Sequence, residues 1–303
     1  MAGVIQTGTL PKLLWPGIKK IWGTSYNDHK VQYTDLFTVE TSDKKYEEFV
    51  EYVGFGLAPE KPEGLGITYD TDAQGPVTRL QSVTYALGFM VTREAMKDNL
   101  YMEVARRRVP RLARSMRLTK EHVHALVYSR AFTSTYTGGD GKELCATDHP
   151  TFDGTQSNEL TNAANLSEAA IEDMLIQVND AKDSRGQRIA LQGQSLVIPT
   201  ALQFEAHRIL KSVLQSDTAA NAVNAIRSMG MLPDGVKVNN YLTSTTGWFI
   251  RTDAPDGMIS LEREPIEFGE DGDFDTHNQK YQAYERYIPG WGDWRGLYGT
   301  PGV

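Results

Sequence analysis

The longest helical pattern in the sequence, Thr92–Phe132, most constrains what the chain can fold into. Met96, Leu100 and Val104 recur every four residues, which places them on one face of a helix. The first residue of the pattern is a suitable N-cap. At a rise of about 1.5 Å per residue, an unbroken helix here would be roughly 60 Å long, more than a small domain needs. Because Pro110 removes one helix hydrogen bond, we predict one long kinked helix or two helices nearly in line.

Composition narrows the class of protein. A chain of 303 residues has room for two domains or for one domain with large excursions, and 40% hydrophobic residues suffice for a packed core. The formal net charge of −8 argues against a coat that binds nucleic acid through its mean charge. Cys145 stands alone, which excludes an intrachain disulfide and a multi-cysteine metal site. No apolar run reaches the ~18 residues of a membrane helix, so we expect a soluble, intracellular protein.

The first 55 residues carry much aromatic surface without a regular period. Pro11, Pro16 and Gly17 predict that no single element spans the apolar stretch 10–22. Such a segment buries little of itself, so we expect it to pack either on its own domain or on a neighbouring subunit. We predict an extended piece over 33–39 and a strand or short helix over 44–52.

Residues 54–91 suggest a projecting β-hairpin. Runs with strand character occupy 66–72 and 77–90, and the polar turn DAQG lies between them. An isolated two-stranded hairpin is marginal in water, so a long one implies a partner surface.

The remaining chain mixes helices and strands, which indicates an α+β fold. Ser167 should cap a helix over 166–182, because Ile171, Met174 and Val178 then share one face. We also expect buried strands over 195–199 and 247–251, a helix over 200–214, strands over 236–242 and 280–288, and an acidic turn over 270–275.

None of the chemistry-bearing residues forms a recognised catalytic or metal motif. His122 and His124 point in different directions on a helix, so they do not share a metal as an i, i+4 pair would. Asp148 and His149 lack a nucleophile, and we expect Asp148 to bond local backbone. The acidic residues 270–275 depart from calcium-loop spacing.

The long helix is strongly basic between residues 106 and 120. Phosphate binding is one interpretation, and ion pairing with acidic surfaces of this chain or its copies is the other. The excess of 39 acidic over 31 basic residues favours ion pairing. The residues concerned are Arg106, Arg107, Arg108, Arg111, Arg114, Arg117 and Lys120.

This order of parts resembles the major capsid proteins of tailed bacteriophages, which have the HK97-type fold. The sequence LSEAAIEDMLIQVNDAK with the following DSRGQRIAL, the stretch SLVIPTALQFEAHRILKS, and VNNYL, GWFIR and KYQAYERY are similar to the Mu-like major head subunit family. The resemblance implies an N-terminal arm (1–55), an E-loop hairpin (56–90), a P-domain (91–189) with spine helix 93–132, an A-domain (190–270), and a return strand with C-terminal tail (271–303).

By the same resemblance, the chain is expected to assemble through hexamers and pentamers into an icosahedral shell around phage double-stranded DNA. It implies a structural virion protein without cofactor, metal or membrane, formed in the host cytoplasm with a scaffolding protein, a portal and possibly a decoration protein. Because the chain begins directly with the arm, scaffolding is expected from a separate protein or a removed segment. Expected intersubunit contacts are Trp15, Trp22, Lys61, Arg79, Arg107, Arg111, Trp291 and Trp294.

Three alternatives stay open. An encapsulin-like nanocompartment shell would use the same fold and would carry a cargo-binding pocket. A DNA-binding protein would use the arginine-rich helix over 106–120 and would bind in a strongly salt-dependent way. A hydrolase would have to centre on Asp148 and His149.

Overall fold

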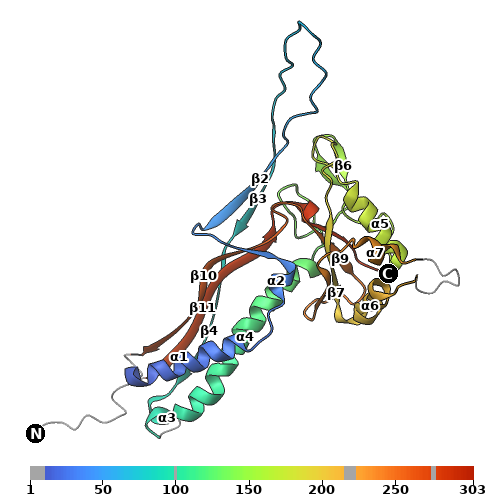
Figure 1. Ribbon diagram of the computed structural model, residues 1–303. Helices are drawn as coiled ribbons and strands as arrows, with labels where there is room; N and C mark the ends of the chain where they lie inside the picture. Colours follow the sequence, from blue (N-terminus) through green and yellow to red (C-terminus); the bar gives the residue numbers. More distant parts are fainter. Residues whose placement is uncertain (1–10, 99–100, 215–222, 274–277) are drawn as a thin grey trace, which may run out of the picture.

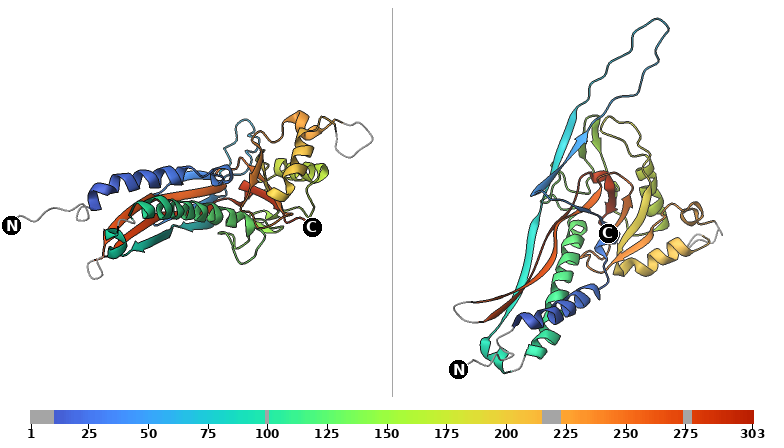
Figure 2. Two further views of the ribbon diagram at one scale, coloured as in Figure 1. Left: turned by 90° about the horizontal axis from the view of Figure 1, so that it is seen from below. Right: turned by 60° about the vertical axis from the view of Figure 1, so that its left-hand side comes forward.

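A computed structural model describes residues 11–98, 101–214, 223–273 and 278–303. The molecule is elongated, with a long hairpin projecting from one end and two β-sheets packed with helices behind it (Figures 1 and 2). Helices and strands are mixed along the chain rather than segregated, as an α+β fold requires.

The first sheet and the longest helix form the elongated half of the molecule. Its strand order is β1-β10-β11-β4, with β1 parallel to β10 and the other pairs antiparallel. Helix α4 (Tyr101–Ser129) lies along one face of this sheet, and α1 (Pro11–Asn27) packs beside it (Figure 1). The strands are β1 (Thr38–Thr41), β4 (Val83–Val91), β10 (Met258–Gly272) and β11 (Gln279–Trp291).

The second sheet has the order β12-β9-β7-β8 and the most apolar core. The strands are β7 (Gly193–Pro199), β8 (Gly235–Asn239), β9 (Trp248–Thr252) and β12 (Leu297–Thr300), and the helices are α5 (Glu168–Asn179), α6 (Gln203–Lys211) and α7 (Ala225–Met229), with 3-10 turns at Thr200–Leu202 and Trp294–Gly296.

Several expected elements of this half are confirmed. Ser167 caps α5 by accepting the backbone N–H of Ala170, and Ile171, Met174 and Val178 are buried. The strands expected over 195–199 and 247–251 are β7 and β9, both buried. These elements were predictable because their caps and apolar patterns are local.

The projecting hairpin has a different partner from the expected one. It pairs β2 (Tyr46–Tyr52) with β3 (Gln74–Gln81), whereas residues 66–72 belong to the long connecting loop 53–73. The predicted second strand is itself divided at Ser82 into β3 and β4. The hairpin therefore begins at Tyr46, ten residues before the expected E-loop.

The N-terminal prediction was wrong about α1. Helix α1 is continuous from Pro11 through Pro16 and Gly17. Pro11 occupies the first helical position, where its missing N–H would have no partner. Pro16 removes one hydrogen bond within the helix, and the packing of Trp22 on the sheet stabilises the part that follows. The piece over 33–39, expected to be extended, begins with a short helix α2 (Tyr33–Leu36).

The long helical pattern is broken earlier than expected. Thr92 caps a short helix α3 (Arg93–Lys97), with Thr92 Oγ1 accepting the N–H of Ala95 at 3.4 Å. Helix α4 then continues through Pro110, because Val109 and Leu112 on either side of it are anchored in the core.

The 15-residue strand β10 was not predicted. Its first four residues are all buried, and register shifts between Glu262, Glu264 and Glu267 interrupt the alternation that marks a strand. Residues 270–272 end this strand, so only residue 273 of the expected acidic turn is described outside a strand, and residues 274–277 lie outside the described chain. The strand expected over 280–288 is confirmed within β11.

Candidate assembly surfaces

The loop at the tip of the hairpin, residues 53–73, presents apolar side chains to solvent. Leu57 is 82% exposed and Tyr69 is 86% exposed. Contiguous exposed apolar surface marks interaction sites in soluble proteins. The loop carries four acidic residues and one basic residue, Lys61, so it is apolar and acidic at once. The other exposed apolar residues of the loop are Phe55, Leu65 and Ile67.

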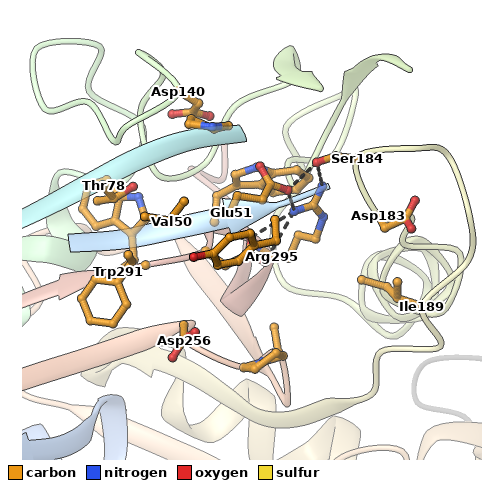
Figure 3. A pocket seen from close by; sticks show the side chains of 18 of the residues that line it. Val50, Glu51, Thr78, Asp140, Asp183, Ser184, Ile189, Asp256, Trp291 and Arg295 are labelled. Carbon is orange, nitrogen blue, oxygen red and sulfur yellow. Dashed lines mark hydrogen bonds and ion pairs between the residues drawn. The ribbon is translucent and has the colours of Figure 1, made fainter. Parts of the chain in front are cut away.

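The hairpin is fastened to the body by a buried arginine at its base. Arg295, 3% exposed, donates from Nη1 to Oε1 of Glu51 on β2 at 2.9 Å (Figure 3). It also donates from Nε to the carbonyl of Lys182 at 2.8 Å. Asp293 lies on the same guanidinium at 3.3 Å, and Ser184 donates to Glu51. A buried charge-assisted network of this kind is costly to break once formed. The angle of the hairpin is therefore set at Arg295.

Two loops of the body contact the hairpin. Gln187 donates to the carbonyl of Phe55 at 3.1 Å, and Arg185 pairs with Asp70 at 3.1 Å. On the other strand, the N–H of Gly139 donates to Oγ1 of Thr78 at 3.1 Å. A Cβ atom at position 139 would lie 2.3 Å from a backbone oxygen of the hairpin, so only glycine fits there.

A pocket of about 400 Å³ opens between the hairpin base and the body (Figure 3). Two of its carboxylates are engaged: Asp183 accepts the N–H groups of Arg185 and Gln187 at 2.9 and 2.8 Å, and Glu51 is held by Arg295. Trp291 also lines it. The pocket is a joint between parts of the subunit, and sequence analysis gave no signal for Arg295 or Glu51, since nothing local marks a buried ion pair.

The N-terminal helices are held to α4 by aromatic and cationic contacts. Trp22, 5% exposed, stacks on Phe268 with ring centroids 4.7 Å apart. The guanidinium of Arg117 lies 3.8 Å from the centre of the Tyr26 ring. Glu121 accepts the N–H groups of Gln32 and Tyr33, each at 3.0 Å, and burial raises its pKa. Here the arm packs in its own subunit's core, and a contact of Trp22 with another subunit stays a prediction.

Two buried titratable groups lie on α4 and β11, in the seam where the N-terminal helices, α4 and the first sheet pack together. Glu285 is 1% exposed and lies 4.0 Å from Nζ of Lys120, which also pairs with Glu262. Burial raises the pKa of Glu285 to about 7. His124 donates from Nδ1 to the Lys120 carbonyl and accepts from Ser260, both at 2.7 Å, and burial lowers its pKa to about 3. The seam thus combines a proton-holding carboxyl with a neutral imidazole.

Some basic residues of α4 are buried within the subunit, and others are exposed to solvent. Arg117 and Lys120 are buried and engaged within the chain, whereas Arg108, Arg111 and Arg114 are exposed. Spacings of three residues place the exposed arginines on neighbouring positions of the helix surface. Arg107 is exposed as well, and the side chain of Arg106 lies outside the described residues. The outcome is a basic outer face on α4, which the sequence pattern of three consecutive arginines did not predict.

The other expected contact residues differ in their exposure to solvent. Trp294 is 8% exposed, and its ring centroid lies 4.2 Å from that of His149, so it packs within the subunit; its contact with another subunit stays a prediction. Arg79 is exposed on the hairpin, where it pairs with Glu48 at 2.6 Å. Trp291 is half-buried at the hairpin base. The side chain of Trp15 lies outside the described residues.

The structure separates the residues of the hydrolase alternative. Asp148 pairs with Lys142 at 2.5 Å instead of bonding local backbone as expected. His149 is fully buried and bonds Asp140 at 2.6 Å and Asn158 at 3.1 Å. Cys145 is fully buried, and its burial raises the pKa of the thiol. In the part of the chain that the structure describes, no cluster of His, Cys, Asp or Glu has the makings of a metal site, and no helix is long and apolar enough to cross a membrane.

Solved structures with a similar fold come from phage and virus-like shells. The capsid of Myoviridae phage XM1 aligns over 100% of both chains with a TM-score of 0.51 and 12% identity. The procapsid of bacteriophage JBD30 aligns over 98% of this chain and 76% of that one, with a TM-score of 0.51 and 14% identity. A virus-like particle from Pyrococcus furiosus covers 93% of this chain and 97% of that one, with a TM-score of 0.53 and 9% identity. No curated protein sequence matches the chain.

Sequence comparison gives the family. Residues 76–299 match the family described as phage capsid protein, which is most of the chain. The chain therefore belongs to the phage capsid protein family. Together with the aligned capsids, this match identifies a tailed-phage major capsid protein with the HK97-type fold, as the sequence resemblance predicted. It is a structural component of a capsid shell.

Proposed function

We propose that the protein self-assembles through hexamers and pentamers into an icosahedral shell that encloses phage double-stranded DNA. The observation that carries the proposal is the hairpin, because a loop of 21 residues (53–73) with several exposed apolar side chains buries little within one subunit. Many modest contacts between copies, repeated by symmetry, are sufficient to close a shell. The net charge of −8 limits adhesion of packaged DNA to the wall.

We assign the parts of the shell subunit to elements of the fold as part of this proposal. The hairpin Tyr46–Gln81 would serve as the E-loop, α4 as the spine helix, and the sheet β1-β10-β11-β4 as the P-domain. The sheet β12-β9-β7-β8 with α5, α6 and α7 would form the A-domain around hexamer and pentamer centres. The N-terminal segment would be the arm, of which α1 stays on its own subunit.

Charge complementarity indicates where the hairpin tip docks. The tip is acidic and apolar, and the outer face of α4 carries the exposed Arg108, Arg111 and Arg114. Opposite charges steer partners together and fix their register. We assign the basic face of α4 on a second copy as the partner of the tip, which favours ion pairing between copies over phosphate binding for these arginines.

The role is structural, without catalysis or a cofactor. We place the protein in the virion after assembly in the host cytoplasm, with a scaffolding protein, a portal and possibly a decoration protein as partners. No membrane is involved in this proposal.

Negative-stain microscopy of the protein, expressed alone and then with the neighbouring genes, tests the proposal. Closed shells, or rings of five and six subunits, are expected. A protein that stays monomeric or dimeric in both settings would contradict it. Nuclease-protected double-stranded DNA in the particles would distinguish a phage head from an encapsulin-like compartment, in which a protein cargo is expected instead.

A charge-swap experiment tests the docking of the tip. Arg108→Glu with Arg111→Glu should reduce shell yield at least about tenfold, because two ion pairs become repulsive. Adding Glu60→Lys and Glu63→Lys on the hairpin should restore shells. Full yield from the α4 double variant with DNA no longer retained would support the DNA-binding alternative, and failure of the swap to rescue would show that the tip docks elsewhere.

A further inference from the structure

The seam between the N-terminal helices, α4 and the first sheet carries more carboxyl groups than cations. Among the residues that the structure describes there, the cations are Arg117 and Lys120, and the carboxyl groups are those of Glu121, Glu262 and Glu285. The side chain of Glu262 is 24% exposed, and the other four residues are buried. Burial of an uncompensated charge is costly, so a proton on one of the carboxyl groups balances the seam.

Glu285 is the carboxyl group best placed to hold that proton. Glu121 accepts the backbone N–H groups of Gln32 and Tyr33, and Glu262 pairs with Lys120. Hydrogen bonds and ion pairs of this kind favour the ionised form of a carboxyl group. Neither carboxyl oxygen of Glu285 has a hydrogen bond of standard geometry in the described chain, and burial raises the pKa of this group to about 7.

The aromatic groups next to Glu285 and Lys120 do not supply the missing positive charge. Burial raises the pKa of the four tyrosines and lowers that of the histidine to about 3, so all five side chains are neutral between about pH 5 and about pH 8. These residues are Tyr26 of α1, Tyr33 of α2, Tyr85 of β4, His124 of α4 and Tyr287 of β11.

The two cations also hold the N-terminal helices α1 and α2. The guanidinium carbon of Arg117 lies 3.8 Å from the centre of the Tyr26 ring, and Nζ of Lys120 lies 5.0 Å from the centre of the Tyr33 ring. An ionised Glu285 attracts both cations and competes with these rings for them. Helix α1 lies along α4 at the surface of the molecule (Figure 2), so its opening would admit water to the carboxylate.

We propose that the protonation state of Glu285 controls the N-terminal helices: α1 and α2 stay packed on α4 while the carboxyl group holds a proton, and they open more often once it ionises. The inference concerns a single folded subunit and goes beyond the shell function. In an opened, hydrated seam the carboxyl group titrates near its ordinary pKa of about 4.3, whereas the closed seam holds the proton up to about pH 7. Opening therefore becomes more frequent as the pH rises through this range, and its frequency is constant above it.

Hydrogen exchange of the full chain, followed by mass spectrometry at about pH 5 and about pH 8, tests the inference. Each rate is divided by the intrinsic chemical exchange rate at the same pH. Peptides that cover α1 and α2 should lose protection at least about tenfold at the higher pH, because opening is coupled to release of the proton. Peptides from α5 and β7, in the other core, should change much less.

Two variants identify the groups responsible, and a third is the matched control. Glu285→Gln resembles the protonated side chain, so its N-terminal helices should exchange at least about tenfold more slowly than those of the parent at about pH 8. Glu262→Gln frees Lys120 to pair with Glu285 and should also reduce the pH response. Glu267→Gln removes an exposed carboxylate from β10 and should behave like the parent.

Four results would overturn the inference. They are unchanged protection of α1 and α2 in the parent at the two pH values, the same loss of protection in Glu285→Gln as in the parent, an equal loss in α5 and β7, and a full response in Glu262→Gln. An equal loss would show that the whole chain opens, and a full response in Glu262→Gln would contradict the charge balance. Because the measurement reports on the subunit's own helices, none of these results bears on the shell proposal.

Discussion

The two sheets of this subunit are stabilised in opposite ways. The sheet β12-β9-β7-β8 and α5 enclose a core of largely aliphatic residues around Trp248. The seam between the arm, α4 and the sheet β1-β10-β11-β4 encloses Lys120, Glu121, His124 and Glu285 among aromatic rings. The first region depends on volume and packing, and the second depends on hydrogen bonds and protonation. A change of pH should therefore destabilise the seam before it destabilises the aliphatic core.

The largest loss of stability is expected in the aliphatic core. Trp248 is fully buried, and its indole N–H donates to the Ala164 carbonyl at 3.1 Å. Trp248→Ala should lower the free energy of unfolding by about 3–5 kcal/mol, measured by urea denaturation. Phe204→Ala, at an exposed position of α6, is the matched control and should change it by less than about 0.5 kcal/mol. Equal effects of the two variants would contradict the assignment of this core.

A smaller loss is expected where the arm meets α4. Glu121→Ala leaves the N–H groups of Gln32 and Tyr33 without their carboxylate, which should cost about 2 kcal/mol. Glu121→Gln keeps one acceptor oxygen and should cost less. Faster proteolysis within residues 11–40 of the alanine variant, with the aliphatic core still resistant, would support local release of the arm. Uniform destabilisation of both regions would show that they unfold as one unit.

The pH dependence of the seam gives a smaller effect for each pH unit crossed. The pKa of Glu285 in the folded protein, about 7, lies above the usual carboxyl value, so the folded state holds an extra proton. Its contribution to stability therefore falls as the pH rises from about 4.3 to about 7, by at most about 1.4 kcal/mol for each pH unit, and is constant above that range. Glu285→Gln should remove this fall and be relatively more stable at pH 8 than at pH 5.

His124 acts with the opposite sign in an overlapping window. Its pKa of about 3 in the folded protein lies below the usual imidazole value, so its contribution is lost as the pH falls from about 6.5. The difference between the parent chain and Glu285→Gln isolates the carboxyl, because both retain His124. Parallel stability curves for the two chains between pH 5 and 8 would contradict the buried, protonated Glu285.

The smallest effect on unfolding is expected at the hairpin tip. Leu57→Ser with Tyr69→Ser replaces exposed side chains, so the free energy of unfolding should change by less than about 0.5 kcal/mol. The yield of shells should fall at least about tenfold if the tip contacts another copy. Unchanged yield, counted by microscopy, would show that these residues take no part in assembly.

Sequence analysis succeeded where the signal was local and failed where partners are distant. The Ser167 cap and the buried run at 195–199 are complete within a few residues, and both were predicted. Helix α1 was missed because its stability comes from Trp22 meeting Phe268, 246 positions away. The hairpin was predicted to exist, but its first strand was misplaced, because pairing of Tyr46–Tyr52 with Gln74–Gln81 spans a 21-residue loop.

The contact residues were harder to predict than the fold. Exposure decides which tryptophans and arginines are available to another copy, and exposure depends on tertiary packing. Trp22 and Trp294 are of a residue type that is common at interfaces, yet they lie in the core. Leu57 and Tyr69 are exposed, but no sequence pattern marked them as candidate contact residues. The acidic and apolar nature of the loop was present in the sequence, but its projection from the body was needed to interpret it.

Because Arg295 holds the hairpin at its base, a small rotation there would displace the tip by a much larger distance than the base. From Glu51, which Arg295 holds, to the middle of the loop the chain extends for some 12 residues, or roughly 40 Å. A rotation of about 10° at this joint would displace the tip by roughly 7 Å and would require the contacts of Arg185 and Gln187 with the loop to rearrange. One subunit could thus adjust its reach to neighbours at different angles through a few bonds around a single guanidinium. Local curvature of the wall would then be adjusted at the base of the hairpin and not at its tip.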